Sequence, residues 1–187
     1  MKKEKIWNIP NALTFVRVIA TFILIYLVFA KANIVSITVV FIVGAITDFM
    51  DGQIARRFNM QTEFGRKFDM IADRFLLIGF FLALVFDYQA GGQITRNNMT
   101  QILLLMSREI ISFPFAIVGF VANRKIPNAR NIGKFVTLMQ GITLPCILLS
   151  INYPIFNFSV YLAVFTCICG IVSASYYVYD LQKEGVK

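Results

Sequence analysis

Two segments decide the fold of this chain: Asp48-Phe-Met-Asp51-Gly52-Gln-Ile-Ala55-Arg56 and, eight residues later, Gly65-Arg-Lys-Phe-Asp69-Met-Ile-Ala-Asp73. They hold four aspartates between strongly apolar runs. A carboxylate at the centre of a membrane helix costs about 2.5–3.5 kcal/mol on insertion scales, so intramembrane acids usually line a polar cavity or a functional site. The two segments therefore indicate a polar site within a membrane protein.

The composition agrees with a polytopic helical membrane protein. The chain has 187 residues, of which 58% are hydrophobic and 15% are charged. That is too apolar and too poor in charge for an ordinary soluble domain. Long apolar runs recur over the whole length, so we expect an all-α protein with one transmembrane domain over residues 1–187.

Six segments are suited to span a bilayer, because about 20 apolar residues cross its core as a helix. They run approximately over Ala12–Lys31, Ile34–Arg56, Gly65–Asp87, Asn98–Val121, Arg130–Ser150 and Phe156–Asp180. We expect these six transmembrane helices to surround a polar cavity that opens to the cytoplasm.

The net charge of +8 reflects an uneven distribution of Lys and Arg among the predicted loops. One side of the membrane holds Lys2, Lys3, Lys5, Arg56, Arg57, Arg66, Lys67, Arg124, Lys125, Arg130, Lys134, Lys183 and Lys187. The other side holds only Lys31 and Arg96. Cytoplasmic loops carry the excess of Lys and Arg, so we expect both termini and the acidic segments on the cytoplasmic side. Nothing in this pattern requires a nucleic-acid partner.

The histidine and cysteine content of the chain limits the chemistry that it can carry out. It has no histidine, which excludes histidine bases and histidine-ligated metals. Its three cysteines lie in apolar stretches, where we expect buried thiols rather than a disulfide framework. The basic N-terminus resembles a signal peptide, but we expect it to be retained as the first span, which completes the topology.

The spacing of the four aspartates indicates a site for hard cations. Asp48 and Asp51 are three residues apart, and Asp69 and Asp73 are four apart, so each pair lies on one face of a helix. The short connection makes the two helices antiparallel neighbours whose acidic faces meet. Four facing carboxylates repel one another, and we expect Mg²⁺ or Mn²⁺, two ions, to compensate that charge.

Other interpretations of the acids remain open on the residues alone. Intramembrane ion pairing, of Asp73 with Arg74 or Arg17, explains one acid but not four. A divalent-cation transporter would place ligands near the midplane of broken helices, often in related halves, whereas these acids lie near one end of a single hairpin. An inactive scaffold of the same fold is a third alternative.

The pattern from Asp48 to Asp73 resembles the signature of the CDP-alcohol phosphotransferases: D-x-x-D-G-x-x-A-R, eight or nine residues, then G-x-x-x-D-x-x-x-D. The resemblance implies transfer of a phosphatidyl group from a CDP-linked lipid to an alcohol, with release of CMP. It also implies that all four aspartates are metal ligands and that Asp73 is the general base. The resemblance implies that Gly52, Ala55, Arg56 and Gly65 bind CDP. We expect Arg66, next to Gly65, to bind CDP as well.

The acceptor alcohol is indicated by the segment from Asn8 to Arg17, which resembles the opening of the phosphatidylglycerolphosphate synthases and of the eukaryotic-type cardiolipin synthases. We expect Asn11 and Arg17 to line the cavity. The expected activity is that of a CDP-diacylglycerol–glycerol-3-phosphate 3-phosphatidyltransferase. Cations for the phosphate of glycerol 3-phosphate would come from Arg108, Arg124, Arg130 and Lys134.

Two departures from the synthase pattern favour an alternative. A second Arg after the Arg-Glu pair is replaced by Ser112-Phe-Pro-Phe115, and a second Lys is replaced by Val136. Cardiolipin synthesis from CDP-diacylglycerol and phosphatidylglycerol is therefore the second hypothesis, and the lipid tails are left open. Membrane lipid surrounds the chain in either case, and a homodimer is an expectation carried over from the family.

Overall fold

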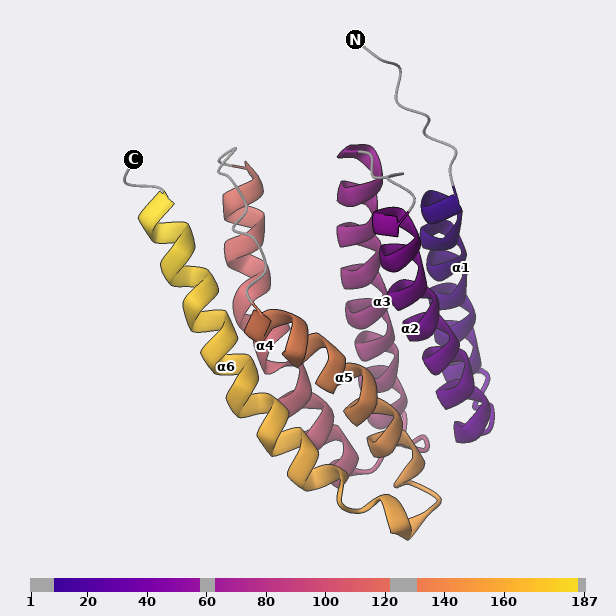
Figure 1. Cartoon of the computed structure of the whole chain (residues 1–187). Helices are drawn as coiled ribbons and strands as arrows, with labels where there is room; N and C mark the ends of the chain where they lie inside the picture. Colours follow the sequence, from indigo (N-terminus) through magenta and orange to yellow (C-terminus); the bar gives the residue numbers. More distant parts are fainter. Residues whose placement is uncertain (1–8, 58–62, 122–130, 185–187) are drawn as a thin grey trace. The chain divides into compact units, whose positions relative to one another are not determined.

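The computed structural model describes residues 9–57, 63–121 and 131–184 (Figure 1). For residues 9–11, 48–57, 63–67, 69–70, 112–121, 131, 177 and 180–184 it describes the backbone only. All regular structure within these ranges is helical. The elements are α1 (Ile9–Phe29), α2 (Ile34–Arg57), α3 (Glu63–Gln89), α4 (Arg96–Val121), α5 (Asn131–Leu149), the 3-10 turn η1 (Pro154–Phe156) and α6 (Ser159–Glu184). The all-α prediction is confirmed over the described ranges, and the predicted helix bounds agree within a few residues.

The chain divides into two compact units, Met1–Thr95 and Arg96–Lys187. The first contains α1, α2 and α3, and the second contains α4, α5, η1 and α6. The single domain predicted over residues 1–187 stays a prediction, and each unit is described separately below.

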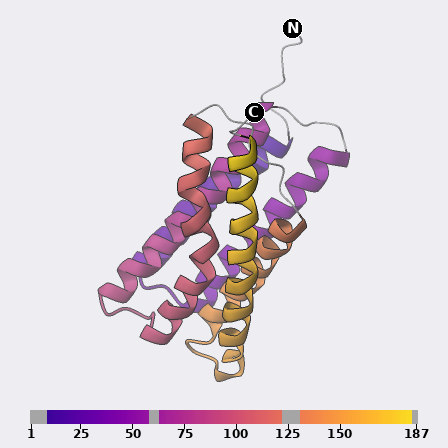
Figure 2. The ribbon, with the colours of Figure 1, turned by 90° about the vertical axis from the view of Figure 1, so that its left-hand side faces the viewer.

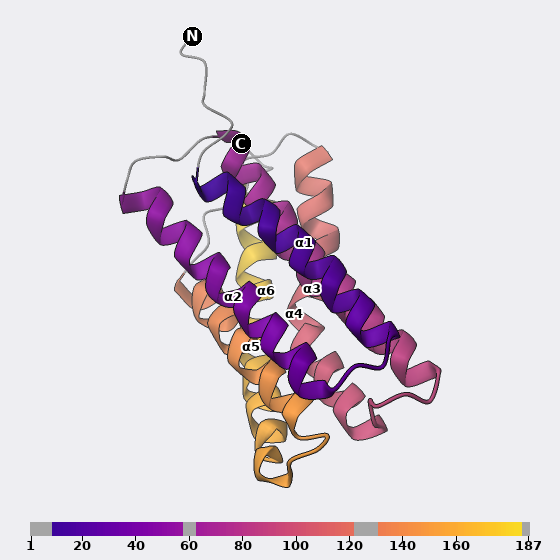
Figure 3. The ribbon, with the colours of Figure 1, turned by 90° about the vertical axis from the view of Figure 1, so that its right-hand side faces the viewer.

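In the first unit, α1 packs against both α2 and α3 (Figure 3). Helices α1 and α3 run in the same direction, and α2 runs opposite to both (Figure 1). The α1–α3 contact is close at Gly79, where an added methyl group would lie 3.4 Å from Ile25 and 3.5 Å from Thr21. Aromatic contact continues it, with the rings of Phe22 and Phe75 centred 5.5 Å apart.

Helices α1 and α3 end in the same backbone motif. Lys31 has a φ of 50° and Gly91 a φ of 65°, the left-handed conformation that terminates many helices. In each case the three amides that follow the helix donate to carbonyls of its last turn: those of residues 30–32 after α1, and those of residues 90–92 after α3. Glycine takes this conformation without steric cost, whereas lysine does not.

The turn after α3 is braced by Asp87, which is 9% exposed. Its Oδ2 accepts a hydrogen bond from the backbone N–H of Ile94 at 3.0 Å. The carboxylate lies directly over Gly92, where a side chain would have no room. From the same turn, Gln93 Nε2 donates to the backbone oxygen of Ala32 at 2.8 Å, which ties the two turns of this unit together.

In the second unit, α6 packs against α4 and α5 (Figure 2). Buried polar side chains join the three helices. Ser159 donates to Gln101 at 2.7 Å, Asn98 donates to Ser150 at 2.9 Å, and Gln140 donates to the Leu105 backbone oxygen at 3.1 Å. Such interhelical hydrogen bonds are a common source of association between helices in apolar surroundings.

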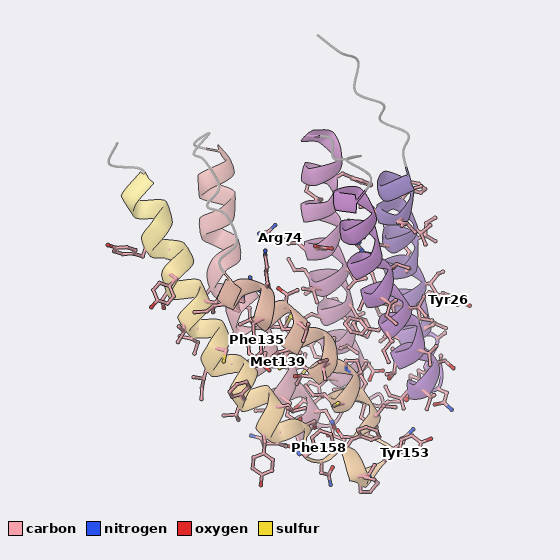
Figure 4. All side chains as sticks on the ribbon, viewed as in Figure 1. Tyr26, Arg74, Phe135, Met139, Tyr153 and Phe158 are labelled. Carbon is pink, nitrogen blue, oxygen red and sulfur yellow. The ribbon has the colours of Figure 1, made fainter. Side chains whose placement is uncertain are left out.

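Among the described residues, three helical segments are long and apolar enough to cross a membrane: Ala12–Phe29, Ile132–Leu149 and Pro154–Tyr176. The prediction of a helical membrane protein is thereby confirmed in its coarse form. In α2 the apolar part is shorter, Ile34–Thr47, because the acids begin at Asp48. Large apolar side chains point outward along these segments, as Tyr26 does from α1 at 69% exposure (Figure 4). That is the surface expected of a chain surrounded by lipid.

Candidate active site

The four aspartates lie on the two helices that the sequence predicts, Asp48 and Asp51 on α2 and Asp69 and Asp73 on α3. The side chain of Asp73 is described. The side chains of Asp48, Asp51 and Asp69 lie outside the described part of the structure. Among the side chains that are described, no three acids or cysteines lie together as metal ligands. The carboxylate cage therefore stays a prediction.

The predicted contact between α2 and α3 is present. The rings of Phe41 and Phe80 stack with centroids 5.6 Å apart. Three residues further along α2, Gly44 meets Leu76, to which an added methyl group would be 3.5 Å away. Gly44 leaves space for the Leu76 side chain, so α2 and α3, which both pack along α1, touch each other here through side chains.

The register of this contact leads to the acidic positions. Positions three and four apart share a face of a helix. Along α2, the face of Gly44 continues to Asp48 and then Asp51, and back along α3 the face of Leu76 continues to Asp73 and then Asp69. The four positions thus extend the two faces through which α2 and α3 touch, toward the end where the segment 58–62 connects them.

Asp73 forms an ion pair with Arg17 of α1. Arg17 Nη1 donates to Asp73 Oδ1 at 2.5 Å. The Arg17 side chain is 1% exposed, whereas that of Asp73 is 43% exposed. The pairing of Asp73 with Arg17, one of the two that the sequence offers as an alternative, is therefore present. Arg74 lies on the side of α3 turned away from α1 (Figure 4).

The pairing follows from the order of the helices. Arg17 lies in the first half of α1 and Asp73 in the first half of α3, and both helices start from the same end of the unit (Figure 3). The two residues therefore reach a similar depth. Sequence analysis gives the depth but not the rotation of α1, so it leaves open whether Asp73 pairs with Arg17 or with Arg74.

The predicted CDP-binding positions are placed by backbone alone. Gly52, Ala55 and Arg56 lie in the last turns of α2, and Gly65 and Arg66 lie in the first turn of α3. Their side chains, and that of Asn11 in α1, lie outside the described part. All five CDP positions adjoin the α2–α3 connection, next to the acidic positions along each helix.

Arg108 lies at the junction of the three helices of the second unit. Its Nη1 donates to Thr137 Oγ1 at 3.0 Å and lies 3.3 Å from Glu109 Oε1. Two glycines make room for it. A methyl group added at Gly133 would lie 3.5 Å from Arg108 Nη2, and one added at Gly170 would lie 3.1 Å from Arg108 Cβ.

Of the remaining cationic positions of the prediction, one is described and two are not. Lys134 lies on α5 with an exposed side chain, and Arg124 and Arg130 lie outside the described residues. The ion pair of Arg108 with its neighbour Glu109 is present beside the acceptor-binding role that the sequence predicts for Arg108. Gly170 was not anticipated at this site, because a single small residue in an apolar helix carries no distinctive signal.

Comparisons with known proteins agree with the sequence pattern. The profile of the family described as CDP-alcohol phosphatidyltransferase matches residues 7–172. A CDP-diacylglycerol–glycerol-3-phosphate 3-phosphatidyltransferase of Salmonella choleraesuis (strain SC-B67) is 40% identical over 146 residues, covering 76% of this chain and 77% of that protein. The protein of the same name from Rickettsia typhi (strain ATCC VR-144 / Wilmington) is 30% identical over 146 residues, 76% of each chain.

These similarities cover both units of the chain and include the segments that carry the four aspartates. They make the chain a transferase enzyme, which decides against the cation transporter that the acids alone left open. Because the family profile matches residues 7–172 and the signature from Asp48 to Asp73 is unbroken, this chain belongs to the CDP-alcohol phosphatidyltransferase family.

Proposed function

We propose that this chain is an integral membrane enzyme that transfers the phosphatidyl group of CDP-diacylglycerol to glycerol 3-phosphate and releases CMP. The observation that carries the proposal is the register of α2 and α3, whose contact faces lead to all four signature aspartates. The names of the relatives from Salmonella choleraesuis and Rickettsia typhi support glycerol 3-phosphate as the acceptor.

Divalent cations fit the chemistry of the donor set. Asp48, Asp51, Asp69 and Asp73 offer only carboxylate oxygens, the ligands that Mg²⁺ and Mn²⁺ prefer. The described member, Asp73, has a carboxylate that is partly accessible. When bound, two such ions would neutralise the diphosphate and the charge that develops on the leaving CMP.

The chain's own residues account for the rest of the reaction. Arg56 and Arg66 would bind the diphosphate, because a guanidinium matches phosphate oxygens, while Gly52, Ala55 and Gly65 leave room for the nucleotide. Asp73 would accept the proton of the acceptor hydroxyl. That hydroxyl oxygen bonds to the lipid-side phosphorus, the bond from this phosphorus to the bridging oxygen breaks, and CMP leaves.

The acceptor phosphate would be bound by the cations of the second unit. Arg108 is held by Thr137 and by the neighbouring Glu109, which fix its guanidinium in place. Its side chain is still 20% exposed, so an anion can reach it. Lys134, Arg124 and Arg130 would add positive charge around it. These residues, not the signature, would make the enzyme select a phosphorylated alcohol.

The proposal includes six transmembrane helices with the site at the cytoplasmic side. Helices α2, α3 and α4 have 24, 27 and 26 residues, which at 1.5 Å per residue is long enough to span a bilayer. The excess of Lys and Arg in the predicted loops supports cytoplasmic termini. A nucleotide would then arrive from water while the lipid tails stay in the bilayer. Dimerisation remains an expectation.

The test is CMP release by protein purified in detergent, supplied with CDP-diacylglycerol and Mg²⁺ and with one acceptor at a time. Release should require glycerol 3-phosphate and should be lost in Asp73→Asn. The matched control is Asp87→Asn, which makes the same change at the far end of α3 and keeps an oxygen to accept the Ile94 N–H. Release that survives Asp73→Asn would refute the assigned chemistry.

One observation supports phosphatidylglycerol as an alternative acceptor. Val136, where the related synthases tend to carry a lysine, is 0% exposed in α5, so an apolar residue takes the place of a cation there. Release with phosphatidylglycerol and not with glycerol 3-phosphate would establish cardiolipin synthesis instead.

A further inference from the structure

We propose that Arg17 is a positioning residue for the cation site: it holds one oxygen of Asp73 so that the carboxylate meets the metal in a fixed orientation. This inference rests on the proposed function, in which Asp73 is a metal ligand. It assigns to α1 a part in a site whose signature lies entirely on α2 and α3.

The first argument is the burial of the cation. Arg17 is 1% exposed, and its Nη1 lies 2.5 Å from Asp73 Oδ1. Breaking a buried ion pair is strongly destabilising, so we expect the pair to persist when metal binds. Arginine also suits the task because its donors lie in a rigid plane and bind carboxylates directionally.

The second argument is the accessibility of the anion. Asp73 is 43% exposed although its partner is fully buried. A carboxylate has two oxygens, and the contact with Arg17 engages Oδ1, on the side of α1. The ion pair can therefore fix the side chain without covering it. Hydrogen-bond partners of ligating carboxylates act in this way in metal sites, and their removal typically weakens metal binding by roughly 10- to 100-fold.

The third argument gives the sign of the effect. A positive charge beside a cation site repels the cation, so Coulomb's law alone predicts tighter metal binding when Arg17 becomes neutral. Positioning predicts the opposite, because an unanchored Asp73 loses its orientation. The direction of the change in affinity thus distinguishes the two roles.

The experiment is a titration of the metal-free protein in detergent with Mn²⁺, in which free Mn²⁺ is followed by electron paramagnetic resonance. Arg17→Gln should weaken Mn²⁺ binding by roughly 10-fold or more, and Arg17→Lys should fall between it and the unaltered protein. The control is Thr21→Val, one turn along α1, which removes a buried hydroxyl that bonds only to the Arg17 backbone oxygen in the described contacts. It should leave Mn²⁺ affinity unchanged.

A second pair of variants tests whether Arg17 acts through Asp73. In the Asp73→Asn background, adding Arg17→Gln should cause no further loss of Mn²⁺ affinity, whereas a general structural role would weaken binding again. Unchanged or tighter binding by folded Arg17→Gln overturns the proposal, as does a further loss in the double variant. If Arg17→Gln does not fold, unchanged binding by Arg17→Lys overturns it. Absence of Mn²⁺ binding by the unaltered protein would instead refute the metal site of the proposed function.

Discussion

The turn after α3 gives a prediction that does not depend on function. In Gly92→Ala, the new Cβ would lie 2.0 Å from Asp87 Oδ1 and 2.3 Å from Asp87 Cγ. Non-bonded heavy atoms do not approach this closely, so the Asp87 side chain must leave its position. The hydrogen bond that its Oδ2 accepts from the Ile94 backbone N–H at 3.0 Å is then lost.

The cost can be worked from these contacts. A hydrogen bond to a charged group contributes about 1.5–3 kcal/mol, and the displaced side chain adds about 0.5–1.5 kcal/mol if it is driven off its rotamer. Replacing glycine by alanine returns about 0.4–1 kcal/mol by restricting the unfolded chain. We expect Gly92→Ala to lower the free energy of unfolding by about 1–4 kcal/mol. At roughly 2–4 °C per kcal/mol for a chain of this size, the midpoint falls by roughly 2–16 °C.

The assay is thermal unfolding of the purified protein in detergent, followed by circular dichroism. Gly141→Ala is the matched control, because a methyl group added there meets nothing within 4 Å and lies inside α5, where alanine is the better helix former. The double-mutant cycle with Asp87→Ala is the decisive comparison. Once the carboxylate is absent, Gly92→Ala should cost little. An equal cost of Gly92→Ala in both backgrounds would refute the reasoning.

Three further predictions concern the site and the helix ends. Arg108→Gln should raise the KM for glycerol 3-phosphate by roughly 10- to 100-fold, because one charged hydrogen bond is lost. The KM for CDP-diacylglycerol should stay unchanged. A change in both KM values would refute an acceptor-specific role. Lys31→Gly should raise the free energy of unfolding by about 0.5–1 kcal/mol, and Gly91→Ala should lower it by about 1 kcal/mol. The reason is that both residues have a left-handed backbone conformation, which favours glycine. Thermal unfolding shifts of the opposite sign would contradict this. Asp73→Asn should lower the free energy of unfolding by about 2–4 kcal/mol because Arg17 stays buried, and Arg17→Gln added to it should restore part of the loss.

The sequence predicts the helices well because apolar length is a local property. The bounds of α2 and α4 differ from those expected by only one or two residues. The sequence predicts the start of α6 at Phe156, before its observed start at Ser159, since the apolar run continues through a 3-10 turn that Pro154 begins. Periodicity alone does not distinguish that turn from the first turn of a helix.

The sequence predicts which helix faces carry the site residues, but not which side chains these residues contact. The spacing of Asp69 and Asp73 puts both on one side of α3, and the contacts of Leu76 and Phe80 with α2 agree with that side. The sequence offers both Arg17 and Arg74 as partners of Asp73 and cannot choose between them, because the choice depends on how α1 is rotated about its axis. That rotation is decided by packing, through small residues such as Gly79, and not by any motif.

The ion pair between Arg17 and Asp73 also has a consequence for synthesis at the ribosome. The two residues are 56 positions apart in the chain. At about 5–20 residues per second, several seconds pass after Arg17 is made before its partner exists. A charge at a helix centre costs about 2.5–3.5 kcal/mol on insertion scales, which the apolar residues of α1 can offset at about 0.3–0.6 kcal/mol each. The first helix of the nascent chain can therefore insert with Arg17 before Asp73 has been synthesised, and the ion pair forms once the third helix follows.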